Sequence, residues 1–221
     1  MLKYPCLVLD HDDTVVQSEA TVNYPFFCYI LDEFRPGATI TFQEYIDGCF
    51  YVGFAEMCRQ NYGFTMQELQ DEHRRWKEYV ASHIPAPFPG IERIIHRQKE
   101  EGGLVCVVSH SSREIITRDY LHHFGMLPDV IYGSELPEYQ CKPNPYPLTE
   151  IMKTYNLQPH QLLVVDDLKP AWQMANAVGS PIVFAQWGKL GQDKICEEMT
   201  KLCNYAFESV AQLESFLFEP L

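Results

Sequence analysis

Three aspartates follow a short apolar run near the start of the chain. Residues 7–9 are Leu-Val-Leu, a run too short for a typical helix and typical of a buried strand, and Asp10, Asp12 and Asp13 come directly after it. Two carboxylates ~4 Å apart repel by ~4 kcal/mol at an effective dielectric of ~20, so the cluster implies a bound cation, a raised carboxyl pKa, or both. Its ligands are all oxygens, which favours Mg²⁺ over zinc. The alternative is that residues 12–14 form an Asx turn or helix N-cap after an ordinary strand.

Polar residues also end two later apolar runs, at residues 104–108 and 162–165, which we interpret as buried strands. A lysine followed by proline lies between these two runs in the sequence. Ligands of open parallel sheets bind at the carboxyl ends of the strands, so we expect these side chains to meet in one cleft. The residues concerned are Ser109, His110, Lys142, Asp166 and Asp167.

Each of these residues also has a structural explanation. Ser109 is suited to cap the next helix, a role compatible with phosphate binding. Lys142 is either a fixed site lysine or a solvated surface lysine. Asp166 and Asp167 are either metal ligands or caps of a helix that begins near residue 170, and two acids after an all-apolar strand favour the metal. We expect no catalytic role for either histidine. His110 is a substrate-binding candidate, and His11 either packs the loop or contacts the substrate.

The rest of the chain alternates between strand-like and helix-like segments. This alternation predicts an α/β fold with a mostly parallel sheet and helices on both faces. Right-handed crossovers then bring the carboxyl ends of the strands to one edge. Predicted strands are residues 104–108, 130–132, 162–165, 182–185 and 205–207, and predicted helices are residues 91–101, 112–124, 145–155, 169–178 and 210–218.

Residues 15–86 interrupt this alternation with a helical and strongly aromatic pattern. Thr65 and Glu68 have the spacing of a capping box at the start of the last of these helices. We interpret the segment as a helical insertion and the proline-rich residues 85–90 as a stiff hinge after it. The predicted helices are residues 20–34, 42–47, 53–62 and 65–83, with breaks at residues 35–37, 48 and 62–63.

The composition limits the compartment and the partners. A formal net charge of −13 repels nucleic-acid phosphates and anionic membranes, so we expect neither as a partner. None of the eight cysteines forms a CxxC pair, which favours free thiols in the reducing cytoplasm. We expect no signal peptide, and no apolar run approaches the ~20 residues that span a bilayer.

Taken in order, the motifs at residues 10–14, Ser109, Lys142 and residues 166–167 resemble those of the haloacid dehalogenase superfamily of Mg²⁺-dependent phosphotransferases. The resemblance covers essentially the whole chain and rests on four motifs in the family's order. It implies a Rossmann-like core made of residues 1–14 and 87–221, with an inserted helical cap at residues 15–86. This cap type is similar to that of the C1 subfamily, which includes phosphoglycolate phosphatase and β-phosphoglucomutase-like enzymes.

The resemblance also implies roles for single residues. Asp10 matches the nucleophile that forms an aspartyl-phosphate, and Asp12 matches the general acid that then acts as a base. Thr14 matches a hydroxyl position that supports the loop, and Ser109 matches one that binds a phosphoryl oxygen. Lys142 matches the lysine that neutralises charge on the nucleophile and the phosphate.

A Mg²⁺ site is implied in the same way. Asp166 and Asp167 match the acidic pair that holds the metal together with Asp10 and the backbone carbonyl of Asp12. Which member of the pair binds directly stays open. Phosphoryl transfer mainly requires positioning and charge neutralisation, which a divalent ion, a lysine and a hydroxyl supply.

The chain departs from the family pattern at two places. Asp13 stands where glycine is common; aspartate tolerates a left-handed backbone better than most residues, but it adds negative charge. After Gly48 the chain has no arginine of the kind that grips a second phosphate in related sugar-phosphate mutases. Phe50, Tyr51 and Phe54 instead suggest an apolar, aromatic or sugar-like leaving group, with Tyr51 as a substrate-binding candidate, or simply packing inside the cap.

The leading hypothesis is a cytoplasmic Mg²⁺-dependent phosphatase that hydrolyses a small phosphorylated metabolite, as a monomer or weak homodimer. The alternatives are a phosphomutase of the β-phosphoglucomutase type and a catalytically inactive protein that binds a phosphoryl ligand. Asp12 disfavours a dehalogenase, since true dehalogenases lack that second acid. Phosphonate hydrolysis is disfavoured because no cap lysine stands out as a Schiff-base former.

Overall fold

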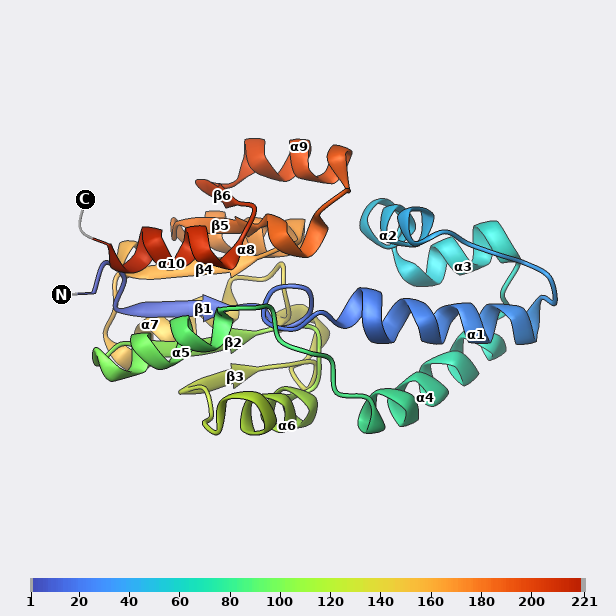
Figure 1. Cartoon of the computed structure of the whole chain (residues 1–221), viewed down its shortest axis with the longest axis horizontal. Coiled ribbons are helices and arrows are strands. Elements are labelled where there is room, and N and C mark those ends of the chain that lie inside the picture. Colours follow the sequence, from blue (N-terminus) through green and yellow to red (C-terminus); the bar gives the residue numbers. More distant parts are fainter. Residues whose placement is uncertain (1, 220–221) are drawn as a thin grey trace. The chain divides into compact units, whose positions relative to one another are not determined.

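The computed structural model describes residues 2–219 of the chain (Figure 1). These residues form two compact units. One unit contains residues 2–17 and 87–219, and the other contains residues 18–86. The first unit is assembled from two separate stretches of sequence, whereas the second is continuous.

The discontinuous unit is built on a parallel sheet (Figure 1). Across the residues described, the sheet has six strands in the order β3-β2-β1-β4-β5-β6, so β1 lies inside it between β2 and β4. Every strand pair is parallel, which brings the carboxyl ends of all the strands to one edge. The strands are β1 (Cys6–Leu9), β2 (Leu104–Val108), β3 (Val130–Tyr132), β4 (Leu162–Asp166), β5 (Ile182–Ala185) and β6 (Tyr205–Phe207).

Strand β1 shows why the sheet needs cover on both faces. Successive side chains of a strand point to opposite faces, and here both sets are apolar. Leu7 and Leu9 belong to one buried cluster, while Cys6 and Val8 belong to the other. The first cluster is completed by side chains of α5, α6 and α10, and the second by side chains of α7 and α8. Their bounds are α5 (Ile91–Glu100), α6 (Arg113–Phe124), α7 (Tyr146–Tyr155), α8 (Lys169–Val178) and α10 (Val210–Phe218).

The remaining elements of this unit are shorter connections and one further helix. Helix α9 (Asp193–Leu202) was not predicted from the sequence, although it buries Ile195 and Met199 on one side. The 3-10 turns are η2 (Glu138–Gln140), η3 (Pro159–Gln161) and η4 (Gln186–Lys189).

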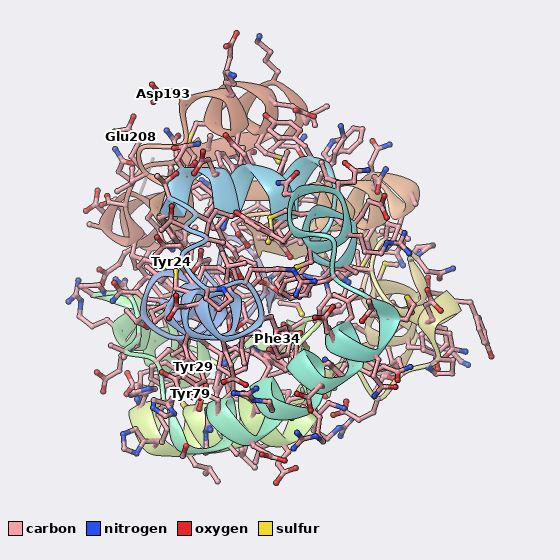
Figure 2. All side chains as sticks on the ribbon, turned by 90° about the vertical axis from the view of Figure 1, so that its right-hand side faces the viewer. Tyr24, Tyr29, Phe34, Tyr79, Asp193 and Glu208 are labelled. Carbon is pink, nitrogen blue, oxygen red and sulfur yellow. The ribbon has the colours of Figure 1, made fainter. Side chains whose placement is uncertain are left out.

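The continuous unit is helical throughout. Two of its helices begin with a complete capping box, Thr41 with Glu44 and Thr65 with Glu68, in which each side chain bonds the other residue's backbone N–H. Aromatic contacts fill its interior, among them Phe26 against Tyr79 at 5.1 Å between ring centroids; Figure 2 labels Tyr79. The elements are η1 (Glu19–Asn23), α1 (Tyr24–Phe34), α2 (Phe42–Tyr51), α3 (Phe54–Tyr62) and α4 (Met66–Ser82).

One predicted break in this unit is wrong. Helix α2 does not stop at Gly48 but continues to Tyr51. A Cβ atom at position 48 would lie 2.2 Å from Sδ of Met57 in α3. The glycine therefore permits two helices to approach closely, and it does not end the first one.

The prediction of an α/β fold with a Rossmann-like parallel sheet is confirmed. Over residues 2–219, no helix combines the length and apolar composition needed to cross a membrane.

Candidate active site

The carboxyl edge of the sheet gathers most of the predicted site residues of the discontinuous unit. Asp10 follows β1, Ser109 follows β2, and Asp166 ends β4, with Asp167 next to it. All four side chains are buried. Because β1 pairs with both β2 and β4 in parallel register, residues far apart in sequence end at the same level of the sheet.

Lys142 joins two of these carboxylates. Its Nζ atom lies 2.7 Å from Oδ1 of Asp10 and 2.7 Å from Oδ2 of Asp166. Burial alone would lower the pKa of Lys142, but the adjacent carboxylates of Asp10 and Asp166 hold it above its usual value. The alternative of a solvated surface lysine is therefore wrong, since the ammonium group is buried and remains charged.

The chemistry of the donor set fits a divalent metal ion. Asp10, Asp166 and Asp167 each offer a carboxylate oxygen, and these oxygens all lie within 4.8 Å of one another. Burial, followed by the nearby carboxylates, raises the pKa of Asp166, with Lys142 opposing the shift. A divalent cation would remove this electrostatic cost, and an all-oxygen set suits a hard cation. Asp166 also accepts a hydrogen bond from the N–H of Leu168, the N-cap residue of α8, so it supports the helix start as well.

Asp12 is not one of these three carboxylates, and it is hydrogen-bonded to a serine instead. Oγ of Ser111 donates a hydrogen bond of 2.5 Å to Oδ2 of Asp12. Ser111 is itself buried, and its N–H bonds Oγ of Ser109 at 3.1 Å. The two serines thus connect the end of β2 to the loop after β1. Asp12 is partly exposed, whereas Asp10, Asp166 and Asp167 are buried.

The loop after β1 makes a tight turn. Asp13 adopts φ 53°, the left-handed conformation for which glycine is the usual residue. The carbonyl of His11 accepts hydrogen bonds from the N–H groups of Val15 and Val16. Oγ1 of Thr14 donates to Oδ1 of Asp167 at 3.3 Å. The Thr14 hydroxyl therefore joins the loop after β1 to the acidic pair at the end of β4.

His11, between Asp10 and Asp12, points into the protein. Its Nε2 atom lies 3.0 Å from Oδ2 of Asp119 in α6, and Arg118 donates to the other oxygen of that carboxylate. Burial raises the pKa of Asp119, but the hydrogen bonds from His11 and Arg118 outweigh it and leave the pKa below its usual value. Of the two interpretations of His11, loop packing and substrate contact, the structure supports loop packing.

Ser109 and His110 differ in their surroundings. Ser109 is buried and does not cap α6, because that role belongs to Ser112, whose side chain accepts from the N–H of Ile115. His110 is exposed, and its Nε2 atom lies 3.2 Å from the carbonyl oxygen of Lys142. It therefore contacts the backbone that carries the site lysine.

Tyr51, the predicted substrate contact in the other unit, is the last residue of α2. Half of its surface is exposed, and its ring packs edge-on against Phe50 at 4.9 Å between centroids. Phe54, by contrast, packs against Phe27 within the helical unit.

Sequence reasoning missed three residues next to the site: Ser111, Asp119 and Lys189. Lys189 lies after β5, and its Nζ atom contacts both Asp13 and Asp167. The adjacent strand end was a usable signal for Ser111. No local pattern pointed to Asp119 or Lys189, since His11, the partner of Asp119, and Asp13, one partner of Lys189, are each more than a hundred residues away in the chain.

Together, the parallel sheet and its edge define an α/β enzyme with a carboxylate-lysine site suited to phosphoryl chemistry. The sequence matches the haloacid dehalogenase-like hydrolase family over residues 7–185, which is most of the chain. The protein belongs to that family, and the prediction of a hydrolase enzyme of this type is confirmed.

Two curated relatives are both named phosphoglycolate phosphatase, and they indicate a phosphatase. The protein from Haemophilus influenzae is 24% identical over 159 residues, covering 69% of this chain and 68% of the relative. The protein from Pasteurella multocida is 25% identical over 164 residues, covering 69% and 70%.

Solved structures share the fold. A predicted phosphoglycolate phosphatase from Haemophilus somnus superposes with a TM-score of 0.74 at 16% identity, covering 98% of this chain and 99% of that one. A family hydrolase from Deinococcus radiodurans with bound phosphate and sodium gives a TM-score of 0.73 at 16% identity, covering 97% and 95%. The CbbY protein from Rhodobacter sphaeroides in complex with xylulose-(1,5)bisphosphate gives 0.65 at 18% identity, covering 83% and 86%.

Proposed function

We propose that the protein is a Mg²⁺-dependent phosphatase that hydrolyses a small phosphate monoester through an aspartyl-phosphate on Asp10. The contacts of Lys142 carry the proposal: one buried ammonium group bridges Asp10 and Asp166, beside Asp167. Because Lys142 partly neutralises the negative charge of Asp10, a dianionic phosphoryl group can bind beside this carboxylate.

In the first step a carboxylate oxygen of Asp10 attacks phosphorus and the bond to the ester oxygen breaks. Protonated Asp12, oriented by Ser111, gives its proton to the departing oxygen. Lys142 and the Ser109 hydroxyl bind the phosphoryl oxygens.

In the second step Asp12, now a carboxylate, takes a proton from a water molecule. The water oxygen attacks phosphorus, the acyl-phosphate bond breaks, and Asp10 is regenerated with release of inorganic phosphate. Asp10, Asp166, Asp167 and the backbone carbonyl of Asp12 would hold the Mg²⁺ ion, which supplies positive charge to the phosphoryl oxygens.

We further propose that residues 15–86 form an inserted helical cap, that residues 1–14 and 87–221 form the core, and that Tyr51 contacts the leaving group. The curated relatives make 2-phosphoglycolate the first substrate to test. We place the protein in the cytoplasm, as a monomer or weak homodimer without nucleic-acid or membrane partners. All eight cysteines lie in the described part of the chain and are free thiols, which supports that compartment.

The test is release of free phosphate from a panel of phosphorylated metabolites, headed by 2-phosphoglycolate, with Mg²⁺ and with chelator. Wild type should release phosphate only with Mg²⁺, and mass spectrometry after acid quench should find Asp10 phosphorylated. Asp10→Asn should lower release by at least about a thousandfold, since the nucleophile is lost. Asp193→Asn, an exposed aspartate labelled in Figure 2, is the matched control and should match wild type.

Different failures point to different alternatives. Substantial release by Asp10→Asn would remove Asp10 as the nucleophile. Turnover that requires a bisphosphate and releases little phosphate would favour a mutase. Stoichiometric binding of a phosphorylated ligand without turnover would favour an inactive binding protein.

A further inference from the structure

The chain after β5 is fitted closely to the loop that carries the aspartates. Nε1 of Trp187 donates to the carbonyl oxygen of Thr14 at 3.0 Å. A Cβ atom at Gly188 would lie 1.9 Å from the carbonyl oxygen of Asp13, so any larger residue would push the two segments apart. These two contacts fix where the next side chain, Lys189, can reach.

Lys189 reaches two carboxylates from that position. Its Nζ atom lies 3.0 Å from Oδ2 of Asp13 and 2.5 Å from Oδ2 of Asp167. Lys189 is 3% exposed, Asp13 5% and Asp167 1%, so solvent screens these contacts weakly. Asp13 is thus turned toward a lysine, and it is not part of the cluster that can hold a metal.

The formal charges of the buried groups then match a divalent ion. Asp10 and Asp166 share Lys142, while Asp13 and Asp167 share Lys189. Four carboxylates and two ammonium groups leave a net charge of about −2 when all are ionised. The charges of Asp13 and Lys189 therefore cancel, so this pair adds no net charge to the site. Asp13 stands where the family commonly has glycine.

We propose that Lys189 is the internal counter-cation of the metal site: it holds Asp167 in place when no metal is bound and lowers the site's affinity for Mg²⁺, while Asp13 offsets part of that effect. The inference rests on the metal site of the proposed function. Lys189 is a positioning residue in this scheme, since it acts through Asp167.

Electrostatics gives the pair a distinctive signature. An ammonium group close to a ligand oxygen repels an incoming cation, and a buried carboxylate beside that ammonium weakens the repulsion. Removing Lys189 should therefore tighten Mg²⁺ binding, and removing the charge of Asp13 should weaken it. Removing both restores the original net charge and should return the affinity to near the wild-type value.

The test measures Mg²⁺ binding by calorimetry, without substrate, for wild type, Lys189→Met, Asp13→Asn and the double variant. Asparagine suits position 13 because it tolerates the left-handed backbone. We expect the dissociation constant to fall about tenfold in Lys189→Met, to rise about tenfold in Asp13→Asn, and to change less than threefold in the double variant. Lys169→Met, which removes a half-exposed lysine paired with Glu198, should leave it unchanged.

Thermal unfolding without metal provides a second measurement on the same proteins. Lys189→Met should unfold at a lower temperature than wild type, and saturating Mg²⁺ should restore more stability to it than to wild type, because the ion replaces the lost charge. Without metal, the double variant should unfold at a temperature closer to that of wild type than Lys189→Met does.

The outcomes separate this inference from the proposed function. Shifts of the dissociation constant in the same direction for both single variants, or no shift in either, would overturn the role of the pair while leaving the metal site intact. Absence of Mg²⁺ binding by wild type would overturn the metal site and the counter-cation together. A Lys189→Met protein too unstable to titrate leaves the sign of the Asp13→Asn shift to decide, and tighter binding there would contradict the inference.

Discussion

Nε2 of His11 lies 3.0 Å from Oδ2 of Asp119, and neither side chain is exposed to solvent. The residue between the candidate nucleophile and the candidate acid is thus tied to helix α6. The neighbouring Asp10 has a different partner, since its Oδ1 atom lies 2.7 Å from Nζ of Lys142. Loop geometry and interior packing are therefore coupled at one residue.

His11→Leu should lower the free energy of unfolding by about 2 to 3 kcal/mol, since it leaves the buried carboxylate of Asp119 with less compensation. Urea unfolding measures the change. His96→Leu is the control, because that histidine is partly exposed and lies 3.9 Å from Glu92. A loss below about 0.5 kcal/mol for His11→Leu would show that the contact contributes little.

Ser111→Ala should lower kcat about tenfold with little change in KM, because Asp12 loses the hydroxyl that orients it. Steady-state phosphate release on the best substrate measures both constants. Ser112→Ala is the matched neighbour: it removes the N-cap of α6 and should cost about 1 kcal/mol of stability without altering kcat. Equal effects of the two variants on kcat would argue against the role of Ser111.

Glu72 makes the helical unit sensitive to pH. Burial raises the pKa of Glu72 from 4.5 to about 7. The folded protein therefore holds a proton that the unfolded chain releases, so this group's contribution is fully present below pH 4.5 and is lost as the pH rises through 7. Glu72→Gln should remove this slope and raise stability at pH 8 by up to about 3 kcal/mol.

Unfolding in urea at pH 5 and pH 8 checks this prediction. Glu78→Gln, at an exposed position of the same helix, should keep the wild-type dependence. Parallel pH profiles for wild type and Glu72→Gln would contradict the assignment.

Tyr51→Ala should change the ranking of substrates more than it changes the rate on a generic aryl phosphate, if Tyr51 contacts the leaving group as proposed. Relative kcat/KM values across the metabolite panel measure this. Tyr139→Ala provides a control, since Tyr139 is an exposed tyrosine of the other unit. An unchanged ranking would assign Tyr51 to the surface of the helical unit alone.

Much of the fold was predictable because its signals are local. The apolar run at residues 104–108 is strand β2 with the predicted bounds, and the pattern at residues 169–178 is helix α8 with the predicted bounds. Both depend on periodicity and on a terminating residue, which a single sequence displays. Gly48 misled the prediction because its role, contact with Met57, belongs to packing between helices.

The site residues likewise divide into those that have a local sequence signal and those that have none. Asp10, Ser109 and Asp166 were found because each follows an apolar run, and parallel pairing then determines that they meet. Lys189 was missed because a single lysine after a short strand resembles a solvated surface residue. Only the fit of Gly188 against Asp13 brings it into the interior.

The central place of β1 has a consequence for how the protein is made. Cys6 pairs with Leu104 on one side and with Leu162 on the other, so β1 acquires its second neighbour only when β4 has been synthesised. At a synthesis rate of ~5–20 residues per second, the emergence of β4 follows that of β1 by on the order of ten seconds. The helical segment is synthesised during that interval, whereas Asp10, the proposed nucleophile, acquires the neighbouring carboxylates Asp166 and Asp167 only after β4 has emerged. A nascent chain arrested before β4 would therefore contain Asp10 without the two acidic neighbours that the proposed mechanism requires.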